Sequence, residues 1–282
     1  MARPLRIEYP GAVYHVTSRG NHRGGIFLNR SDRVAFLSLL AETVRRFHLS
    51  CYAYCLMGNH YHLLLETSEP NLARAMRHLN GVYTQRFNWE HSESGHLLQG
   101  RYAAILIDKS SHLLEVCRYI ALNPVRAGLA PAPSDWEWSS YRATVGLEEV
   151  PGFMDASTVL AQFGHDAPSA RRRYAEFVQE GDVPVPWSGL TGGLILGDEN
   201  FAARCRLMAR AVGDLAEIPK EQKHIGRPPL DELLRGPAPN GEKWRLAVDA
   251  YGYTQNEVAA GAGVHYSWVS RVLAGERSKV KT

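Results

Sequence analysis

The chain has 282 residues, of which 45% are hydrophobic and 22% are charged, and its formal net charge is +3. A chain of this length and composition can bury a full core, which predicts a main domain and a smaller one. No apolar run approaches the roughly 18 residues of a membrane-spanning helix, and the segment from Met1 to Pro4 lacks the apolar core of a secretion signal. We therefore expect a cytoplasmic protein without a membrane partner.

The N-terminal segment carries a local excess of positive charge. Glu8 is its single acid up to residue 30, whereas arginine occupies positions Arg3, Arg6, Arg19, Arg23 and Arg30. Such an excess favours a polyanionic partner such as a nucleic acid. An ordinary solvated basic face is the alternative.

The hydrophobic pattern predicts alternating strands and helices. We expect strands at 12–18, 50–57, 60–66 and 102–107, a helix capped by Ser31 or Asp32, and a second helix at 71–89. The order β-α-β-β-α-β is that of a ferredoxin-like antiparallel sheet with helices on one face, which is an α+β fold.

Two histidines, His60 and His62, begin the third predicted strand, directly after a Gly58-Asn59 turn. Side chains alternate along a strand, so these two share a face with Cα atoms roughly 6.6 Å apart. Two imidazoles at this spacing can converge on one ion, which predicts a metal site with two histidine ligands. The alternative is a pair of histidines that are hydrogen-bonded at a strand end.

Cys51 and Cys55 precede these histidines, but their spacing argues against a zinc site. Four strand residues separate their Cα atoms by roughly 13 Å, too far to share a tetrahedral ion. With Cys117 and Cys205 they form no disulfide framework in a chain of this length. We expect buried structural thiols in a reducing compartment.

A further helix is predicted from Ser110 or Ser111 to about Leu122. Tyr119 and Asn123 fall on one edge of it, a helical turn apart and beside the apolar arc. By itself this pattern is also that of a boundary tyrosine followed by a helix stop, because the residue before Pro124 disfavours the helical region.

Several segments together resemble the single-tyrosine HUH transposases, and in particular the REP-associated tyrosine transposases. They are Tyr-His-Val-Thr-Ser-Arg-Gly-Asn at 14–21, His60-x-His62 after Gly58-Asn59, and Tyr-Ile-Ala-Leu-Asn-Pro-Val at 119–125. Gly-Arg-Tyr at 100–102 and Trp-Ser-Ser-Tyr at 138–141 agree with this resemblance. It covers about residues 6–146, half of the chain.

The resemblance implies that His60 and His62 bind a divalent metal ion, Mg²⁺ or Mn²⁺, with Asn123 as the third ligand. It implies that Tyr119 attacks the scissile phosphate and forms a 5′-phosphotyrosine link, so that a DNA strand is cut and rejoined. Four other tyrosines remain competitors for the nucleophile by sequence alone: Tyr14, Tyr61, Tyr83 and Tyr102.

The implied substrate is single-stranded DNA that carries a hairpin, of the type of repetitive extragenic palindromes, and the implied location is the nucleoid. Any protein partner is unknown. Five polar side chains are candidate DNA contacts, with ordinary surface polarity as the alternative: Arg19, Asn21, Arg23, Arg101 and Lys109.

The C-terminal part has a helix-turn-helix pattern after proline- and glycine-rich segments at 226–229 and 236–241. Thr254 and Glu257 form a capping box, and the glycine turn at 261–263 leads into a second helix. That helix would offer four side chains to a DNA groove, namely Tyr266, Ser267, Ser270 and Arg271, and a basic tail follows with Arg277, Lys279 and Lys281. A small helical packing module is the alternative.

These patterns predict three parts: a transposase-like domain at 1–146, a helical extension and linker at 147–240, and the helix-turn-helix module at 241–282. Two functions stay open, a metal-dependent DNA strand transferase and a DNA-binding regulator on the same scaffold that has lost catalysis. A nuclease that uses water as its nucleophile is a third. The joint presence of His60, His62, Tyr119 and Asn123 favours the strand transferase.

Overall fold

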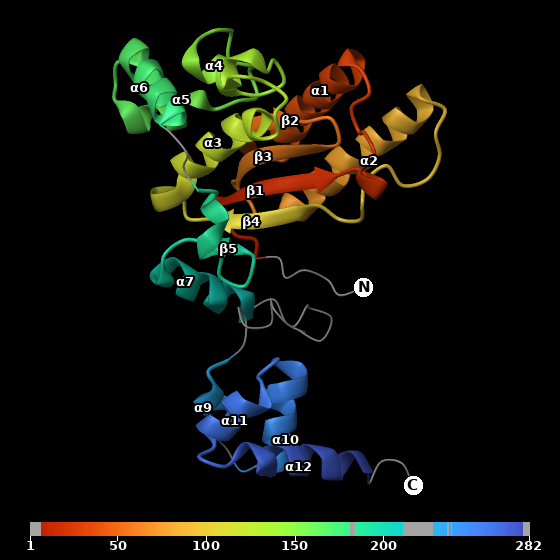
Figure 1. Cartoon of the computed structure of the whole chain (residues 1–282), viewed down its shortest axis with the longest axis vertical. Helices are drawn as coiled ribbons and strands as arrows, with labels where there is room; N and C mark the ends of the chain where they lie inside the picture. Colours follow the sequence, from red (N-terminus) through yellow and green to blue (C-terminus); the bar gives the residue numbers. More distant parts are fainter. Residues whose placement is uncertain (1–6, 181–183, 211–227, 236, 238, 279–282) are drawn as a thin grey trace. The chain divides into compact units, whose positions relative to one another are not determined.

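The computed structural model describes residues 7–180, 184–210, 228–235, 237 and 239–278. The chain divides into two compact units, Glu8–Gly189 and a second unit composed of Met1–Ile7 and Leu190–Thr282 (Figure 1). Among the described residues, no helix is both long and apolar enough to cross a membrane.

The unit Glu8–Gly189 is built on an antiparallel sheet. Its strands lie in the order β2-β3-β1-β4, and each neighbouring pair is antiparallel. Their bounds are β1 Ala12–Arg19, β2 Leu49–Leu56, β3 His60–Thr67 and β4 Ala103–Ile107, with α1 Arg30–Arg46 and α2 Leu72–Glu90 between them. The predicted element order β-α-β-β-α-β and the α+β class are confirmed.

Helices α1 and α2 cover one face of this sheet. Tyr61 of β3 is fully buried there, with its ring 4.9 Å from that of Phe36 and its hydroxyl donating to Oδ1 of Asn80 at 2.6 Å. Because side chains alternate, His60 and His62 emerge on the opposite face.

The N-terminus of α1 differs from the sequence prediction. Asn29 is the cap, and its side chain accepts from the backbone N–H of Asp32 at 3.0 Å. Asp32 closes the capping box by accepting from the N–H of Asn29 at 3.1 Å. The predicted cap at Ser31 or Asp32 therefore lies two or three residues after the observed cap. Asp32 belongs to the capping box, but as the third residue of the helix and not as its cap.

Helix α3, Lys109–Arg126, packs on the face that carries the two histidines, where its Tyr119 ring contacts His62. The prediction of helices on one face thus holds for α1 and α2 but not for α3. The predicted stop at Asn123 was also early, because Pro124 lies inside the helix. The helix continues through the bond from the N–H of Ala127 to the carbonyl of Asn123 at 3.0 Å, one turn beyond the residue before proline.

The segment after α3 extends the same unit beyond the predicted boundary at residue 146. It contains η2 Pro133–Asp135, α4 Tyr141–Val145, α5 Ala156–Leu160, η3 Ala161–Phe163, α6 Ala167–Gln179 and η4 Pro186–Gly189. Ser140 and Asp155 bond to the backbone of β2 at Tyr54 and Cys51. These bonds cover an edge strand that would otherwise leave its polar groups unpaired, so the unit reaches Gly189.

The second unit contains β5 Ile195–Leu196, α7 Glu199–Arg210 and a group of helices. That group is α9 Leu230–Leu234, α10 Asn240–Arg245, the π-helical turn η5 Leu246–Ala250, α11 Gln255–Gly261 and α12 Tyr266–Ser278. Trp244, Val258 and Val269 lie at its buried core, and leucines of α9 pack against this core. The cluster therefore starts before the predicted boundary at 241, since α9 belongs to it.

Two features of the second unit follow the sequence prediction. Thr254 and Glu257 form the predicted capping box of α11. A short turn then leads into α12. The predicted linker positions 226, 227, 236 and 238 and the tail residues Lys279 and Lys281 lie outside the described residues, as does the side chain of Arg277.

Candidate active site

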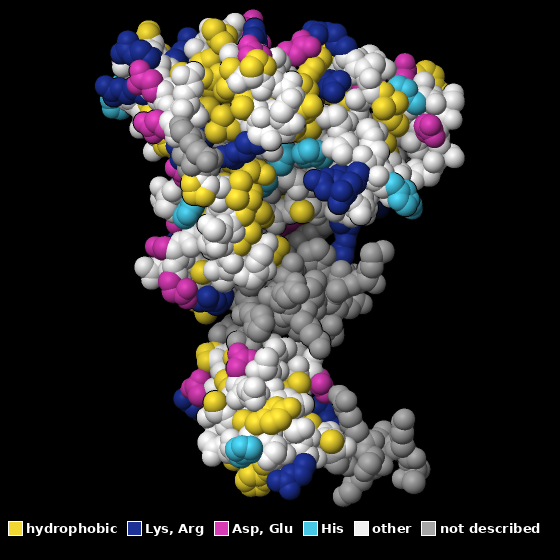
Figure 2. Space-filling view, in the orientation of Figure 1, with side chains coloured by type: hydrophobic (Ala, Val, Ile, Leu, Met, Phe, Trp, Pro, Cys, Tyr) yellow, Lys and Arg dark blue, Asp and Glu magenta, His cyan; other side chains and the backbone are white. Residues whose placement is uncertain are grey.

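One pocket of the first unit is lined by residues of β1, β3, β4, α3, η4 and the segment before β4, many of them polar. Its volume is about 520 Å³. On the face in view, Figure 2 shows histidine side chains next to Lys and Arg side chains. The pocket is lined by His15, Thr17, Ser18, Arg19, His60, His62, Gln99, Arg101, Ala103, Ile105, Tyr119, Asn123 and Trp187.

The strand register explains why these residues meet. In the antiparallel pairing of β1 with β3, Arg19 lies opposite His60 and Thr17 lies opposite His62. Residues that pair directly share a face, so an arginine and both histidines project from the same side of the sheet. Ala103 pairs with Thr17 on the other side of β1, and its small side chain leaves room above the strand.

His60, His62 and Tyr119 converge in this pocket. The ring centroids of His60 and His62 are 5.0 Å apart, and those of His62 and Tyr119 are 5.7 Å apart at an interplanar angle of 82°. The sequence predicted that the two histidines share a face and that Tyr119 lies at the margin of its helix. The structure brings these three side chains together.

Asn123 lies one turn after Tyr119 and also lines the pocket. Its Nδ2 donates to the backbone carbonyl of Tyr119 at 2.9 Å, so the amide oxygen Oδ1 is the atom turned to other partners. A carbonyl oxygen of this kind is a ligand that Mg²⁺ and Mn²⁺ accept.

Both histidines are held neutral by their surroundings. Burial lowers the pKa of His62 well below the usual range, and the neighbouring His15, His60 and Arg19 add to this effect. Burial, together with the charge of Arg19, also lowers the pKa of His60. Neutral imidazole is the form that ligates a metal.

The donor set fits a divalent cation. Nε2 of His62 is buried and has no hydrogen-bond partner among the described residues, and it belongs to a ring that lines the pocket. Two imidazole nitrogens and one amide oxygen then leave room for phosphate or water oxygens on the same ion. Within the described part of the chain, no group of three His, Cys, Asp or Glu side chains could hold a metal ion, so an ion here would take oxygen ligands besides the two imidazoles.

The competing tyrosines lie elsewhere. Tyr14, Tyr61, Tyr83 and Tyr102 are all buried and do not line the pocket. Tyr61 and Tyr83 donate their hydroxyls to Asn80 and to the carbonyl of Ile26, and burial raises the pKa of Tyr14, Tyr61 and Tyr83. Among the pocket-lining residues, Tyr119 is the one phenol.

Two residues of the site were not singled out from the sequence. His15 of β1 is 4% exposed; its ring lies nearly in the plane of the His62 ring, with centroids 5.2 Å apart, and stacks on Trp187 with centroids 4.7 Å apart. Trp187 of η4 also meets the Tyr119 ring edge-on at 4.9 Å. The period-two pattern of β1 places His15 on one face, but the sequence does not say which face. Trp187 follows a proline pair far from the other motifs and carries no local signal.

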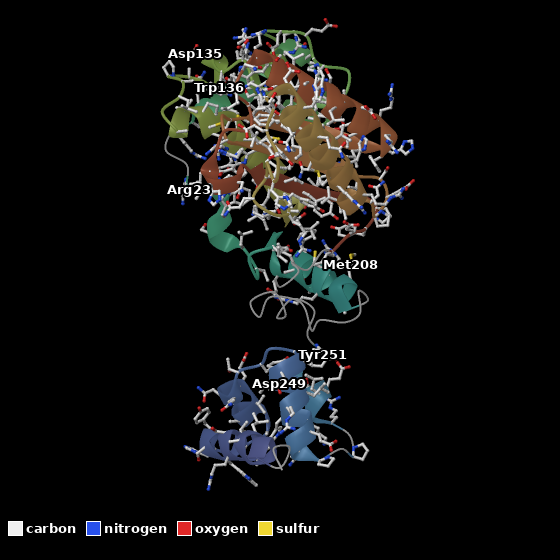
Figure 3. The ribbon with its side chains drawn as sticks, turned by 90° about the vertical axis from the view of Figure 1, so that its right-hand side faces the viewer. Arg23, Asp135, Trp136, Met208, Asp249 and Tyr251 are labelled. Atoms are coloured by element: carbon white, nitrogen blue, oxygen red, sulfur yellow. The ribbon has the colours of Figure 1, made fainter. Side chains whose placement is uncertain are left out.

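The five predicted DNA contacts of this unit occupy different places. Arg19 and Arg101 line the pocket. Asn21 and Arg23 lie in the exposed turn η1 Asn21–Arg23, and Figure 3 labels Arg23 at the margin of the unit.

Lys109 is not brought to the pocket. Its ammonium pairs with Glu66 and lies 5.0 Å from the ring centroid of Tyr52. Glu66 stands six residues after His60 on β3, roughly 20 Å away at the usual rise of a strand. Arg126, which the sequence did not indicate, lies with its guanidinium carbon 5.4 Å from the centroid of Tyr119.

The predicted contacts of the C-terminal module lie at the N-terminal half of α12. Tyr266, Ser267 and Arg271 are exposed, and Ser270 is half-buried. Trp268, on the same helix, is 53% exposed and meets Trp244 edge-on at 6.1 Å.

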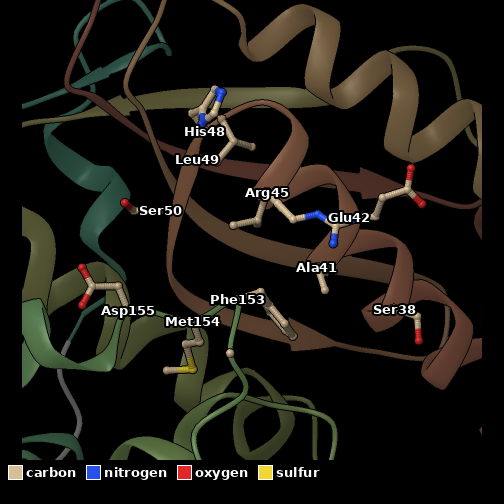
Figure 4. Close-up of a pocket in the computed structure, with 12 residues that line it drawn as sticks. Ser38, Ala41, Glu42, Arg45, His48, Leu49, Ser50, Phe153, Met154 and Asp155 are labelled. Carbon is tan, nitrogen blue, oxygen red and sulfur yellow. The ribbon is translucent and has the colours of Figure 1, made fainter.

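A larger hollow, of about 830 Å³, lies between α1, the start of β2 and the segment 152–155 (Figure 4). It is lined by opposite charges, including Glu42, Arg45 and Asp155, and by none of the residues that converge at Tyr119. The chemistry therefore points to the smaller pocket.

The part of the chain that carries the histidines and Tyr119 matches a known family. Residues 9–123 match the family described as "Transposase IS200 like", a range that begins before β1 and ends at Asn123. This part of the chain is an IS200-like transposase domain. The transposase domain thus contains His15, both pocket histidines and Tyr119.

A known relative agrees with this assignment. A Haemophilus influenzae protein named "Putative REP-associated tyrosine transposase" is 28% identical over 128 residues, which cover 41% of this chain and 72% of that protein. The transposase domain is thus a distant homologue of REP-associated tyrosine transposases. A solved structure of a REP-associated tyrosine transposase bound to a REP hairpin is 19% identical, with a TM-score of 0.45, and covers 55% of this chain and 93% of that one.

Proposed function

We propose that this protein cuts and rejoins single-stranded DNA through a 5′-phosphotyrosine intermediate on Tyr119. The observation that carries the proposal is the convergence of His60, His62, Tyr119 and Asn123 in one pocket, beside Arg19 and Arg101. A nucleophile, a set of ligands for a divalent ion and cationic side chains are groups suited to phosphoryl transfer to a phenol.

Tyr119 would act as the nucleophile, and Arg19 and Arg101 would bind the DNA backbone. The Tyr119 oxygen attacks phosphorus, the bond from phosphorus to the 3′-oxygen breaks, the phenol loses its proton and the leaving 3′-oxygen takes one up. The bond to Tyr119 keeps the phosphodiester activated, so a 3′-hydroxyl can attack it in the reverse direction and rejoin the strand. Arg19 and Arg101 bind backbone phosphates and orient the scissile group.

His60, His62 and Asn123 would hold a divalent ion, Mg²⁺ or Mn²⁺, next to Tyr119. When bound, this ion supplies Lewis-acid polarisation of the scissile phosphate and neutralises charge on its oxygens. The two histidines contribute rigid nitrogen ligands, because their rings pack against each other and the ring of His62 also packs against Tyr119.

We further propose a hairpin of the repetitive extragenic palindrome type as the substrate. The support is the resemblance of the motifs and the name of the Haemophilus influenzae relative. Trp187 at the pocket offers an aromatic surface for an unpaired base.

We also propose that α12 presents Tyr266, Ser267, Ser270 and Arg271 to a DNA groove. A protein partner is not part of the proposal.

The test is a denaturing gel of end-labelled hairpin DNA, with single-stranded flanks, after incubation with the protein and Mg²⁺ or Mn²⁺. We expect a cleaved strand together with a protein-linked strand that protease treatment releases. DNA binding without either product would favour the regulator that has lost catalysis, and cleavage without a protein-linked strand would favour water as the nucleophile.

A further inference from the structure

The two histidines proposed as metal ligands are each held through the same ring atom. Nδ1 of His60 lies 2.7 Å from Oδ1 of Asn59, and Nδ1 of His62 lies 2.9 Å from Nε2 of His15. In both rings Nε2 is therefore the nitrogen turned to other partners. For His62 this atom is buried and has no partner in the described residues.

The hydrogen bond of His60 has one possible direction. Nδ2 of Asn59 donates to the backbone carbonyl of Arg23 at 3.0 Å, which fixes the amide so that Oδ1 faces His60. A carbonyl oxygen only accepts, so Nδ1 of His60 carries the hydrogen and Nε2 carries the lone pair. The turn between β2 and β3 thus selects the ligating tautomer of His60.

The bond between His62 and His15 has two possible directions. If His15 donates from Nε2, Nε2 of His62 carries a hydrogen and cannot ligate. If Nδ1–H of His62 donates to His15, Nε2 of His62 presents a lone pair to the pocket. The second direction is the one that a metal ion requires, because a ligating histidine usually donates its other N–H to a fixed acceptor.

His15 is placed firmly enough to serve as that acceptor. It is 4% exposed on the central strand β1, and its ring is nearly parallel to those of His62 and Trp187, at 11° and 17°. The Nε2 to Nδ1 distance of 2.9 Å and the small interplanar angle place the rings of His15 and His62 side by side in nearly one plane, and Trp187 stacks on the ring of His15. Burial and these two contacts hold Nε2 of His15 beside His62.

We propose that Asn59 and His15 are positioning residues that set the tautomers of His60 and His62, so that both rings present Nε2 to the same ion. The proposal rests on the metal-dependent function proposed above. Each residue acts through the ring it bonds to, and neither has to contact DNA or the ion.

Metal affinity tests this directly. Binding of Mn²⁺ to the full-length protein without DNA is measured from the electron paramagnetic resonance signal of free Mn²⁺. We expect His15→Leu and Asn59→Leu each to weaken binding about 10- to 100-fold, the range found when the partner of a metal-ligating histidine is lost. Asn59→Asp keeps an acceptor oxygen, and His15→Gln supplies one in place of the ring nitrogen, so both should recover most of the affinity.

Matched controls come from the same unit. His165 is exposed on the loop before α6, and Asn88 makes one amide-to-carbonyl bond, to Gly95 at 3.0 Å, away from the pocket. His165→Leu and Asn88→Leu should leave Mn²⁺ affinity unchanged. Circular dichroism shows whether each variant is folded. Asn59 lies in a half-exposed turn, so its variants keep the test decisive if the core variant His15→Leu unfolds.

Nitrogen NMR of ¹⁵N-histidine-labelled protein with Mg²⁺ gives a second readout, independent of cutting. We expect protonated Nδ1 and unprotonated Nε2 for both His60 and His62, and loss of this preference at His62 in His15→Leu. Unchanged Mn²⁺ affinity in the folded leucine variants, or no recovery by the acceptor variants, would overturn the proposal while leaving the proposed function intact. Absence of Mn²⁺ binding by the parent protein would overturn both.

Discussion

The ring of Tyr119 lies 5.7 Å from that of His62, centroid to centroid, and is turned 82° to it. One residue comes from helix α3 and the other from strand β3, so the contact joins the proposed nucleophile to the proposed metal site across the face of the sheet. This relationship makes the predicted roles of individual side chains testable.

Replacing Tyr119 by Phe should abolish cleavage and the protein-linked product. The change removes one hydroxyl at a half-buried position, so folding and DNA affinity should stay close to those of the parent. Gel cleavage and fluorescence anisotropy measure the two properties. Tyr61→Phe is the control, because Tyr61 is buried on the α1–α2 face and its variant should still cut. Parent-level cutting by Tyr119→Phe would exclude this residue as the nucleophile.

Replacing His60 or His62 by Ala should stop cleavage, because the ion loses one of its two nitrogen ligands. EDTA should stop the parent in the same way, and added Mg²⁺ or Mn²⁺ should restore it. His165→Ala controls for the loss of an exposed histidine. The metal assignment fails if the parent cuts at full rate in chelator.

Asn123→Ala should raise the Mn²⁺ concentration needed for half-maximal cleavage by about tenfold or more, on the scale of losses seen at metal sites. Asn123→Asp keeps an oxygen at the position where Oδ1 now lies, so its requirement should be closer to that of the parent. Cleavage rates measured over a Mn²⁺ titration decide between these outcomes. Equal curves for the alanine variant and the parent would remove Asn123 from the ligand set.

Deleting residues 228–282 should leave a folded transposase domain that binds DNA more weakly. The cut is placed before α9, because the leucines of α9 pack on the core around Trp244 and a cut at 241 would split that core. The deletion removes Arg271 and other cations, so the slope of log affinity against log salt should become shallower by about 0.9 for each lost contact to duplex phosphate. Titrations at several salt concentrations measure it. Arg271→Ala is the point control, and identical slopes for all three proteins would mean that the module serves another role.

Local patterns predicted most of the first unit because its elements are strongly periodic. The alternation of β3 gave the shared face of His60 and His62, and the helical spacing of Tyr119 and Asn123 gave their common edge. The helix after β4 was predicted to end before Pro124, but it runs to Arg126. Tertiary packing decided this, since Pro124 is buried and the next turn of helix is completed around it.

The features that could not be predicted from the sequence depend on contacts between distant segments. His15 lies opposite Leu64 in the β1–β3 register, which no local pattern encodes, and Trp187 reaches the pocket from a turn 68 residues after Tyr119. The place of Lys109 was likewise hidden, because its partner Glu66 is set by the fold.

The most direct test of the central claim is to map the covalent link. The protein is incubated with single-stranded hairpin DNA and Mg²⁺, digested with nuclease and protease, and examined by mass spectrometry for a peptide that carries a nucleotide on tyrosine. We predict a single modified site, at Tyr119, that is absent in EDTA and absent from Tyr119→Phe. Cleaved DNA with no modified tyrosine, or with the nucleotide on another tyrosine, would contradict the account.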